Sequence, residues 1–304
     1  MQKRTKVWTR LGYAALAGGA STLLLAGCGG ESGEGEGKKK APAQETGTVA
    51  PGSGTANGAN GTDEGVHQGH AASATGSGEG EGAPADADLR TDNAAYLTQL
   101  SLVRGHLLVG MGLYRQGAID ASSGHFSHPE IEIYPQLVPV LVARGAKPFK
   151  AELDALAAAV AEAAPKGEIE AAYGRVLAAI DAAEHANTGT ALSEPKSVLA
   201  LIEKIVRVAG TEYGNAVRDG RVVLPVEYQD AFGFTEVAKA RLQAISGKDQ
   251  SASVKAVVAQ VSKQLAGLDA AWPGRKLIPP EKVSATGALF HGAAARIEIA
   301  ALAL

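Results

Sequence analysis

Apolar residues recur at intervals of three and four through the last two thirds of the chain, which is the period of an amphipathic helix. After Asp92, placed as an N-cap, the first stripe holds Tyr96, Leu100, Val103, Leu107, Met111 and Tyr114. Further stripes cover residues 153–160, 173–180, 198–209, 234–245 and 254–265, and a last helix ends near Leu304. The pattern predicts an all-α fold, a helical bundle of about seven to eight helices.

A second helix is expected to begin at Pro129. Ser127 and Glu130 have the spacing of a capping box, and proline suits the first turn of a helix. Two further prolines should kink this helix or shorten it, and Gly145 suits its C-terminal cap. The boundary places His125 in the loop before the helix.

A short internal repeat suggests duplication. Residues 114–120 resemble residues 213–219, and residues 129–132 correspond to residues 225–228. Each unit predicts a helix, a loop and a helix that opens with proline. The bundle could therefore consist of two duplicated hairpin units, with residues 91–190 and 191–304 as candidate halves.

The first 27 residues have the order of a secretory signal peptide, with a basic segment followed by an apolar run. Leu25-Ala26-Gly27-Cys28 resembles the lipobox of bacterial lipoproteins. That resemblance implies cleavage before Cys28, acylation of Cys28 and a lipid anchor in the membrane on the periplasmic side. Gly29 after the cysteine, in place of aspartate, favours the outer membrane by the same resemblance. The alternatives are a plain signal peptide or an N-terminal membrane helix.

Residues 28–90 are expected to form a disordered tether rich in Gly, Ser and Glu, because this composition cannot bury enough apolar surface to fold. As a flexible coil of roughly 60 residues, it would reach on the order of 45 Å. His67 and His70 lie within it and are interpreted as solvated linker histidines. Residues 91–304 remain as the helical domain.

Composition excludes several function classes. Cys28 is the only cysteine, so the chain has no internal disulfide, no thiolate metal site and no covalently attached haem. Without residues 1–27 the chain has 25 basic against 32 acidic residues, and no Lys/Arg cluster offers a phosphate-binding stripe, so no nucleic acid is expected as a partner. Nucleophile elbows, phosphate loops, dinucleotide fingerprints and His-Glu-x-x-His are absent, so no enzyme activity is expected.

The densest group of potential ligands lies between residues 125 and 134. Imidazole and carboxylate groups suit iron, zinc, manganese or copper(II). His128 and Glu132 lie four residues apart on one helix face and could bind one transition metal ion, with His125 closing over the same point. The alternative is structural, because a histidine beside a helix cap often only satisfies backbone groups.

Two residues of the preceding helix are candidate helpers. Tyr114 could supply an oxygen ligand or a hydrogen bond to one. His106 lies in an apolar setting about ten residues, or roughly 15 Å, from the end of its helix. Its depth would match that of Glu132 only if the first helix ended early, and a buried core histidine is the alternative. His185 and His291 are interpreted as structural or surface residues.

Residues 212–223 (EYGNAVRDGRVV), followed by Glu227-Tyr228, resemble the helical periplasmic region of bacterial high-affinity iron permeases. The resemblance extends loosely over the last 110 residues or so. The permease's membrane helices and Arg-Glu-Gly-x-x-Glu motifs are missing. The resemblance implies a tethered helical module that works beside a metal-uptake system, with a metal permease or another envelope protein as its partner.

These features favour a periplasmic, membrane-tethered lipoprotein that binds or delivers a transition metal, preferably iron, as an accessory to uptake. The alternative is a non-catalytic envelope scaffold or protein-interaction lipoprotein without a metal. An exposed apolar patch around His128, with no ligands converging inward, would favour that alternative.

Overall fold

The computed structural model describes residues 87–247 and 250–304. The predicted signal peptide, the lipobox with Cys28, and His67 and His70 of the tether lie outside the described residues. The helices are α1 Asn93–Arg115, α2 Ile119–His128, α3 Tyr134–Ala143, α4 Lys150–Ala161, α5 Lys166–His185, α6 Pro195–Ala216, α7 Pro225–Ala244, α8 Ala252–Gly267 and α9 Gly287–Ala301. A π-helical turn η2 spans Pro129–Ile133, and two 3-10 turns span Leu268–Ala271 (η3) and Pro273–Arg275 (η4). The paired strands are β1 Val217–Arg218 and β2 Arg221–Val222.

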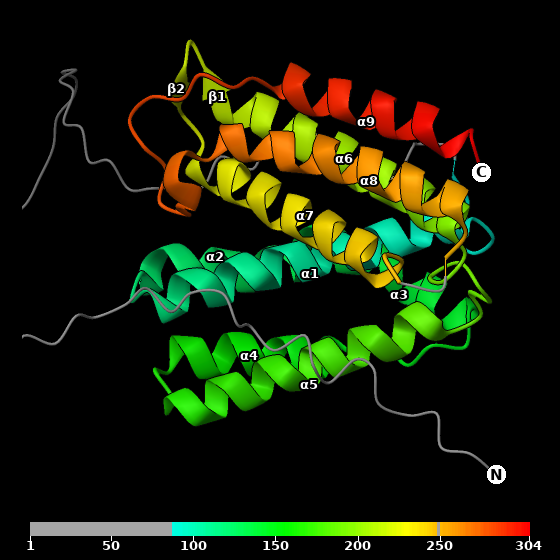
Figure 1. Cartoon of the computed structure of the whole chain (residues 1–304). Coiled ribbons are helices and arrows are strands. Elements are labelled where there is room, and N and C mark those ends of the chain that lie inside the picture. Colours follow the sequence, from blue (N-terminus) through cyan, green and yellow to red (C-terminus); the bar gives the residue numbers. More distant parts are fainter. Residues whose placement is uncertain (1–86, 248–249) are drawn as a thin grey trace, which may run out of the picture. The chain divides into compact units, whose positions relative to one another are not determined.

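The expected all-α fold is confirmed, and the strands form only the short hairpin between α6 and α7. The segment α2–η2–α3 is continuous, so the described residues form eight long helices. The helices pack in successive pairs (Figure 1). The α4–α5 hairpin packs on α1 and α2, α1 packs on α6 and α7, and α8 and α9 cover the other side of α6 and α7.

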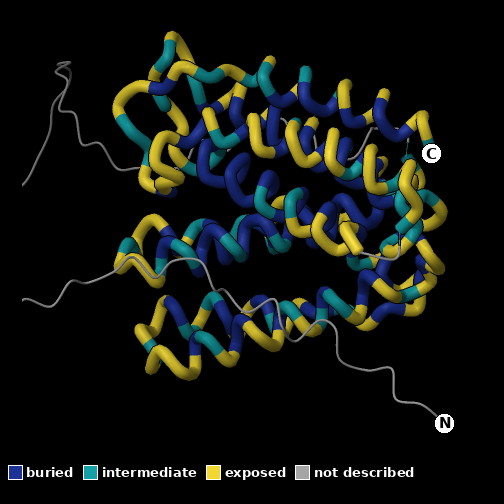
Figure 2. Tube along the Cα trace, viewed as in Figure 1, coloured by how far each residue is buried: buried dark blue, intermediate teal, exposed yellow. Residues whose placement is uncertain are grey.

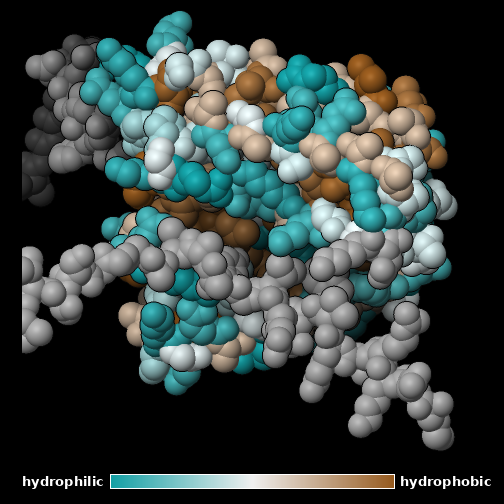
Figure 3. Space-filling view, viewed as in Figure 1, coloured by the Kyte–Doolittle hydropathy of each residue, from teal (hydrophilic) through white to brown (hydrophobic). Residues whose placement is uncertain are grey.

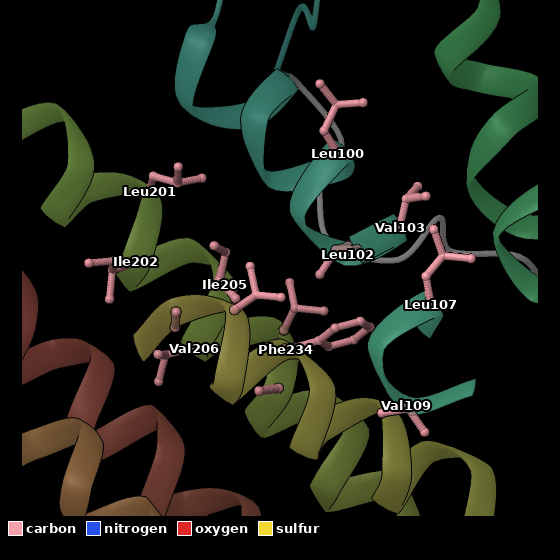
Figure 4. Close-up of a cluster of buried hydrophobic side chains, with 14 of the residues drawn as sticks. Leu100, Leu102, Val103, Leu107, Val109, Leu201, Ile202, Ile205, Val206 and Phe234 are labelled. Carbon is pink, nitrogen blue, oxygen red and sulfur yellow. The ribbon is translucent and has the colours of Figure 1, made fainter. Parts of the chain in front are cut away.

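The buried faces of these helices form one hydrophobic core (Figure 2). Helix α1 begins where the sequence predicted, because the side chain of Asp92 accepts a hydrogen bond from the Ala95 amide. Its side chains meet those of α6 and α7 in the cluster of Figure 4. Leu102, Ile205 and Phe234, one from each of these three helices, are fully buried there. Helix α1 therefore lies inside the bundle rather than at its edge.

The second helix begins ten residues earlier than predicted, at Ile119. Gly117 has a positive φ of 79° and ends α1, and Asp120 lies in the first turn of α2, where a carboxylate favours a helix N-terminus. The capping-box prediction was wrong, because Ser127 donates to the carbonyl of Gly124 and Glu130 pairs with Lys150 instead.

Pro129 lies in the middle of this helix rather than at its start. The helix widens there into a π turn, in which the Tyr134 amide donates to the Pro129 carbonyl. The helix ends as expected at Gly145, whose φ is 73°. The repeat predicted that Pro129 and Pro225 each open a helix. Only Pro225 does so, at the start of α7.

Two glycines set the separation of α1 and α7. A Cβ atom on Gly233 would lie 2.4 Å from the carbonyl oxygen of Gly105. A Cβ atom on Gly105 would lie 2.4 Å from a ring carbon of Phe234. Close backbone contact at this crossing brings the residues beside these glycines, His106 and Asp230 among them, to the same level of the bundle.

A buried charged network links α5 to α1 and α7. Glu184 is 1% exposed and accepts hydrogen bonds from Arg104 at 2.7 Å and from Arg241 at 3.1 Å. Arg104 also pairs with Asp181. Burial alone would raise the pKa of Glu184, but the two guanidinium groups outweigh it and lower the pKa to about 2.

Aromatic side chains, Tyr213 and Tyr228 among them, fill the core between α6, α7 and α9. Both hydroxyl groups donate to the carbonyl oxygen of Ala271, at 3.1 and 3.3 Å, and Trp272 packs edge-on against both rings. Burial raises the pKa of Tyr228 to about 12, so this phenol stays protonated and keeps donating.

Among the described residues, no helix combines the length and the apolar character needed to cross a bilayer. In Figure 3 hydrophilic residues cover much of the visible face, and hydrophobic residues gather at its centre left and at its upper right. The most exposed apolar side chains are Ile131 in η2, Val142 in α3, and Ile299 and Leu302 at the end of α9.

Candidate metal site

Three ionisable side chains from three helices converge at the α1–α7 crossing. His106 comes from α1, His125 from α2 and Asp230 from α7. Both histidines are fully buried and Asp230 is 2% exposed. One potential ligand atom of each lies within 4.8 Å of the others, and this is the only such group of three among the described residues.

The carboxylate of Asp230 lies at the centre of the group. Its Oδ1 atom is 2.8 Å from His106 Nδ1 and 2.9 Å from His125 Nδ1. Burial alone would raise the pKa of Asp230, but the two imidazoles hold it well below its usual range. Asp230 is therefore a buried carboxylate that stays ionised, and a buried negative charge favours cation binding.

Gln229, the residue before Asp230, also contacts the group. Its Oε1 atom lies 2.8 Å from His125 Nε2, and its Nε2 atom donates to the carbonyl of Leu277 at 3.2 Å. The carbonyl can only accept, so it fixes the orientation of the glutamine amide. Gln229 is 3% exposed, so this contact is shielded from solvent.

His128 lies beside the group and is half-buried. Its ring centroid is 6.1 Å from that of His106 and 6.2 Å from that of His125. The ring of Phe234 packs edge-on against His106 at 5.2 Å and covers the apolar side of the site. Three histidines from two helices therefore lie together, two of them against Asp230, and His128 is the most exposed of the three.

The structure groups only some of the residues predicted as ligands. It brings His106, His125 and His128 together, whereas Glu132 is exposed on η2 and lies outside the three-residue group. Tyr114 is half-buried against the core, two turns beyond His106 on α1.

The predicted mismatch in depth between His106 and the second helix does not exist. It followed from placing the helix start at Pro129 and His125 in a loop. Because α2 begins at Ile119 and runs back along α1, His125 reaches the level of His106. His106 therefore lies in the ligand group, and the sequence interpretation underestimated it.

Sequence reasoning missed Asp230 and Gln229. Both lie in a stretch of α7 that is buried on all sides, from Tyr228 to Phe234. An ionisable residue within such a stretch needs a partner, because an unpaired buried charge is costly. That signal was present in the sequence, but the sequence could not identify the partner.

Two histidines and one carboxylate form a recognised donor set. The same combination, arranged on one face, binds ferrous iron and leaves the opposite positions open. Imidazole and carboxylate also accept Zn²⁺, so the donor set indicates a divalent first-row metal. These residues thus fit a metal ion chemically as well as in their spacing.

Residues 188–299 match the iron permease-associated 4-helix bundle domain. The match confirms the resemblance that residues 212–228 suggested, and it extends from the segment before α6 into α9. The four helices α6, α7, α8 and α9 pack together as one group. The comparisons with curated proteins and with solved structures found no match.

The candidate site lies at the boundary of the matched region. Asp230 and Gln229 belong to the four-helix bundle, whereas His106, His125 and His128 belong to helices that precede it. The four-helix bundle alone would supply only one charged potential ligand to the site, the carboxylate of Asp230. The helices before it supply every histidine of the group.

Proposed function

We propose that the chain is a periplasmic, membrane-tethered lipoprotein that binds a transition metal ion, preferably iron, and serves as an accessory to iron uptake. His106, His125 and Asp230 would hold the ion, with His128 on the solvent side. Cys28 would carry the lipid anchor, and a metal permease or another envelope protein would receive the ion. The role is binding or delivery, without catalysis.

The observation that carries this proposal is the convergence of two buried imidazoles on one buried carboxylate. A carboxylate buried this deeply needs charged or hydrogen-bonding partners, and here two imidazoles supply them. The match to an iron permease-associated domain supports iron as the cargo, since Asp230 lies inside the matched residues.

Metal analysis of the chain from residue 29 onward tests the proposal, because this form keeps every described residue and lacks the lipid. Titration of the metal-free protein with Fe²⁺ without oxygen, and with Zn²⁺, should give one equivalent bound with micromolar or tighter affinity. Asp230→Asn and His106→Gln should each weaken binding at least tenfold. His185→Ala is the matched control, because His185 is exposed on α5 and only contacts the backbone of Asp181.

Two further variants separate the sequence-based site from the one in the structure. His128→Ala and Glu132→Ala remove the pair that the sequence placed at the centre. Loss of the ion in Glu132→Ala with full binding in Asp230→Asn would reject the three-residue group. No binding of either metal at micromolar concentrations would refute the proposed function.

The anchor and the scaffold alternative need their own tests. Cys28→Ser should move the protein from the membrane fraction to the soluble fraction, and unchanged fractionation would contradict the anchor. The alternative of a metal-free scaffold called for outward apolar residues and no inward ligands around His128. His106 and His125 lie within 6.4 Å of one another, ring to ring, and both are buried, so the observed arrangement favours metal binding.

A further inference from the structure

The cluster offers two different ways to hold a metal ion, and the distinction depends on Gln229. In the first, Asp230 orients the histidines through their Nδ1 atoms and the metal binds at Nε2, as in many carboxylate–histidine–zinc sites. In the second, the metal binds at the Nδ1 atoms together with Asp230. His125 decides between them, because only one of its nitrogens can be the ligand.

The surroundings of His125 disfavour the first arrangement. Its Nε2 atom faces Gln229 Oε1 at 2.8 Å, in a place that solvent does not reach. Because the Leu277 carbonyl occupies the glutamine's NH₂ group, only the amide oxygen is presented to the imidazole. An oxygen acceptor requires an N–H donor, so Nε2 carries a hydrogen. Nδ1 faces the Asp230 carboxylate at 2.9 Å and also carries a hydrogen when no metal is bound, but an ion held by Asp230 would replace that proton, whereas an ion at Nε2 would have to displace the buried Gln229 amide as well.

We infer that Gln229 is a positioning residue that holds His125 in the form with hydrogen on Nε2, so that His125 binds a divalent metal ion through Nδ1 together with Asp230 and His106. This inference rests on the proposed function. It assigns the ligand atoms and names a residue that touches no metal yet sets how the metal is held.

The spacing of the three atoms agrees with this assignment. His106 Nδ1 and His125 Nδ1 lie 2.8 and 2.9 Å from Asp230 Oδ1. Neighbouring ligands of an octahedral ion with bonds of about 2.1 Å stand roughly 3.0 Å apart. Two of the three donor–donor distances therefore match those of neighbouring ligands on one ion, whereas binding through His125 Nε2 would require the buried Gln229 amide to leave.

The same contact connects the site to the segment after η4. Leu277 accepts the hydrogen bond from Gln229 and packs its side chain against Gly112 of α1, where a Cβ atom would lie 2.7 Å from it. The position of the glutamine amide is thus set by a segment that is itself held in place on α1. Such support from packing is what a positioning residue needs.

The protonation of His125 can be measured without any metal. In the chain from residue 29 onward, labelled with ¹⁵N, long-range ¹H–¹⁵N spectra should show hydrogen on Nε2 of His125 at pH 7. The His125 signals are identified by their loss in His125→Gln. Gln229→Met keeps the size of the side chain but removes both polar contacts, so hydrogen on Nε2 should no longer be fixed. Gln229→Glu keeps the oxygen acceptor and should restore it.

The mode of metal binding is measured with ¹¹³Cd²⁺ and Zn²⁺. Scalar coupling between ¹¹³Cd and Nδ1 of His125 is expected, and coupling to Nε2 would overturn the inference. Gln229→Met should weaken Zn²⁺ affinity about 10- to 100-fold. Gln243→Met is the matched control, since Gln243 is exposed on the same helix, and it should stay within about twofold of the wild type.

The outcomes separate this inference from the proposed function. Wild-type affinity in a folded Gln229→Met, or hydrogen still fixed on Nε2 in that variant, would overturn the role of Gln229. If the wild type bound no metal while only Gln229→Met lost the fixed Nε2 hydrogen, the metal function would fail and the control of His125 by Gln229 would stand. If Gln229→Met does not fold, Gln229→Glu replaces it in the comparison. Coupling between ¹¹³Cd and His125 Nδ1 is then expected, and coupling to His125 Nε2 would refute the inference.

Discussion

Replacing Glu184 by glutamine should destabilise the protein strongly, because among the described residues Glu184 is the only acid that pairs with both Arg104 and Arg241. The substitution keeps the size of the side chain and removes its charge. The side chain of Arg241 is 6% exposed, so it could not recover its lost partner from solvent. Removing one partner of a buried ion pair typically costs about 3–5 kcal/mol, since the remaining charge stays buried.

The pKa of Glu184 gives a second estimate of the same quantity. A lowering from 4.5 to about 2 corresponds to about 3 kcal/mol, at about 1.4 kcal/mol per pKa unit. The two estimates agree in order of magnitude. For a domain of this size, a loss of about 3–4 kcal/mol would lower the melting temperature by roughly 6–15 °C.

Urea unfolding at pH 7, followed by circular dichroism, measures the effect. The matched control is Glu170→Gln, which lies on the same helix and pairs with Arg115 at 2.6 Å, but with both side chains about one third exposed. Exposed pairs contribute about 0–1 kcal/mol, so the control should change the free energy of unfolding little. Equal effects of the two variants would refute the importance of burial for this pair.

The dependence on pH adds a check of sign. Because folding lowers the pKa of Glu184, its contribution is complete above about pH 4.5 and is lost as the pH falls toward 2. The difference in unfolding free energy between the wild type and Glu184→Gln should therefore shrink across this window. A difference that grew on acidification would show that Glu184 does not act through its charge.

Two further substitutions test the packing around the site. Gly233→Ala should cost about 1–3 kcal/mol of unfolding free energy and weaken metal binding, because the new methyl group would lie 2.4 Å from a backbone oxygen of α1. Gly174→Ala, in open space on α5, should instead stabilise the protein by about 0.5–1 kcal/mol. Thermal melts that ranked the two variants the other way would contradict the glycine contact. Tyr213→Phe and Tyr228→Phe should each cost about 0.5–1.5 kcal/mol of unfolding free energy. The double variant should cost more than the sum of the two, because the Ala271 carbonyl then loses both donors. Simple additivity in urea unfolding would count against the shared acceptor.

Most of the fold could be predicted from the sequence, because helices reveal themselves through local periodicity. The N-cap at Asp92 and the end of the second helix at Gly145 follow from residues only a few positions apart. The start of α2 could not be recognised in the same way. Ser122, Ser123 and Gly124 are weak helix formers, and only packing against α1 keeps that segment helical.

The site was harder to predict, because its members lie far apart in the sequence. His125 and Asp230 are separated by 105 positions, and no periodicity links α2 to α7. Local spacing pointed instead to His128 and Glu132, which share a helix segment, and the structure leaves Glu132 exposed. Spacing within one helix shows which side chains share a face, but only the packing of α1 against α7 shows which faces meet.

The boundary of the family match adds a physical consequence. Asp230 lies in the matched four-helix bundle, and its two imidazole partners come from α1 and α2, which pack against α7. Without those helices, the carboxylate would be solvated and would have no imidazole beside it. The bundle by itself therefore cannot make this site. In a chain that keeps α6 to α9 but lacks α1 and α2, the Asp230 side chain should be exposed to solvent, or α7 should pack differently around it. The metal affinity proposed here thus depends on the helices from Asn93 to Ala143 that precede the bundle as well as on Asp230 in the matched region.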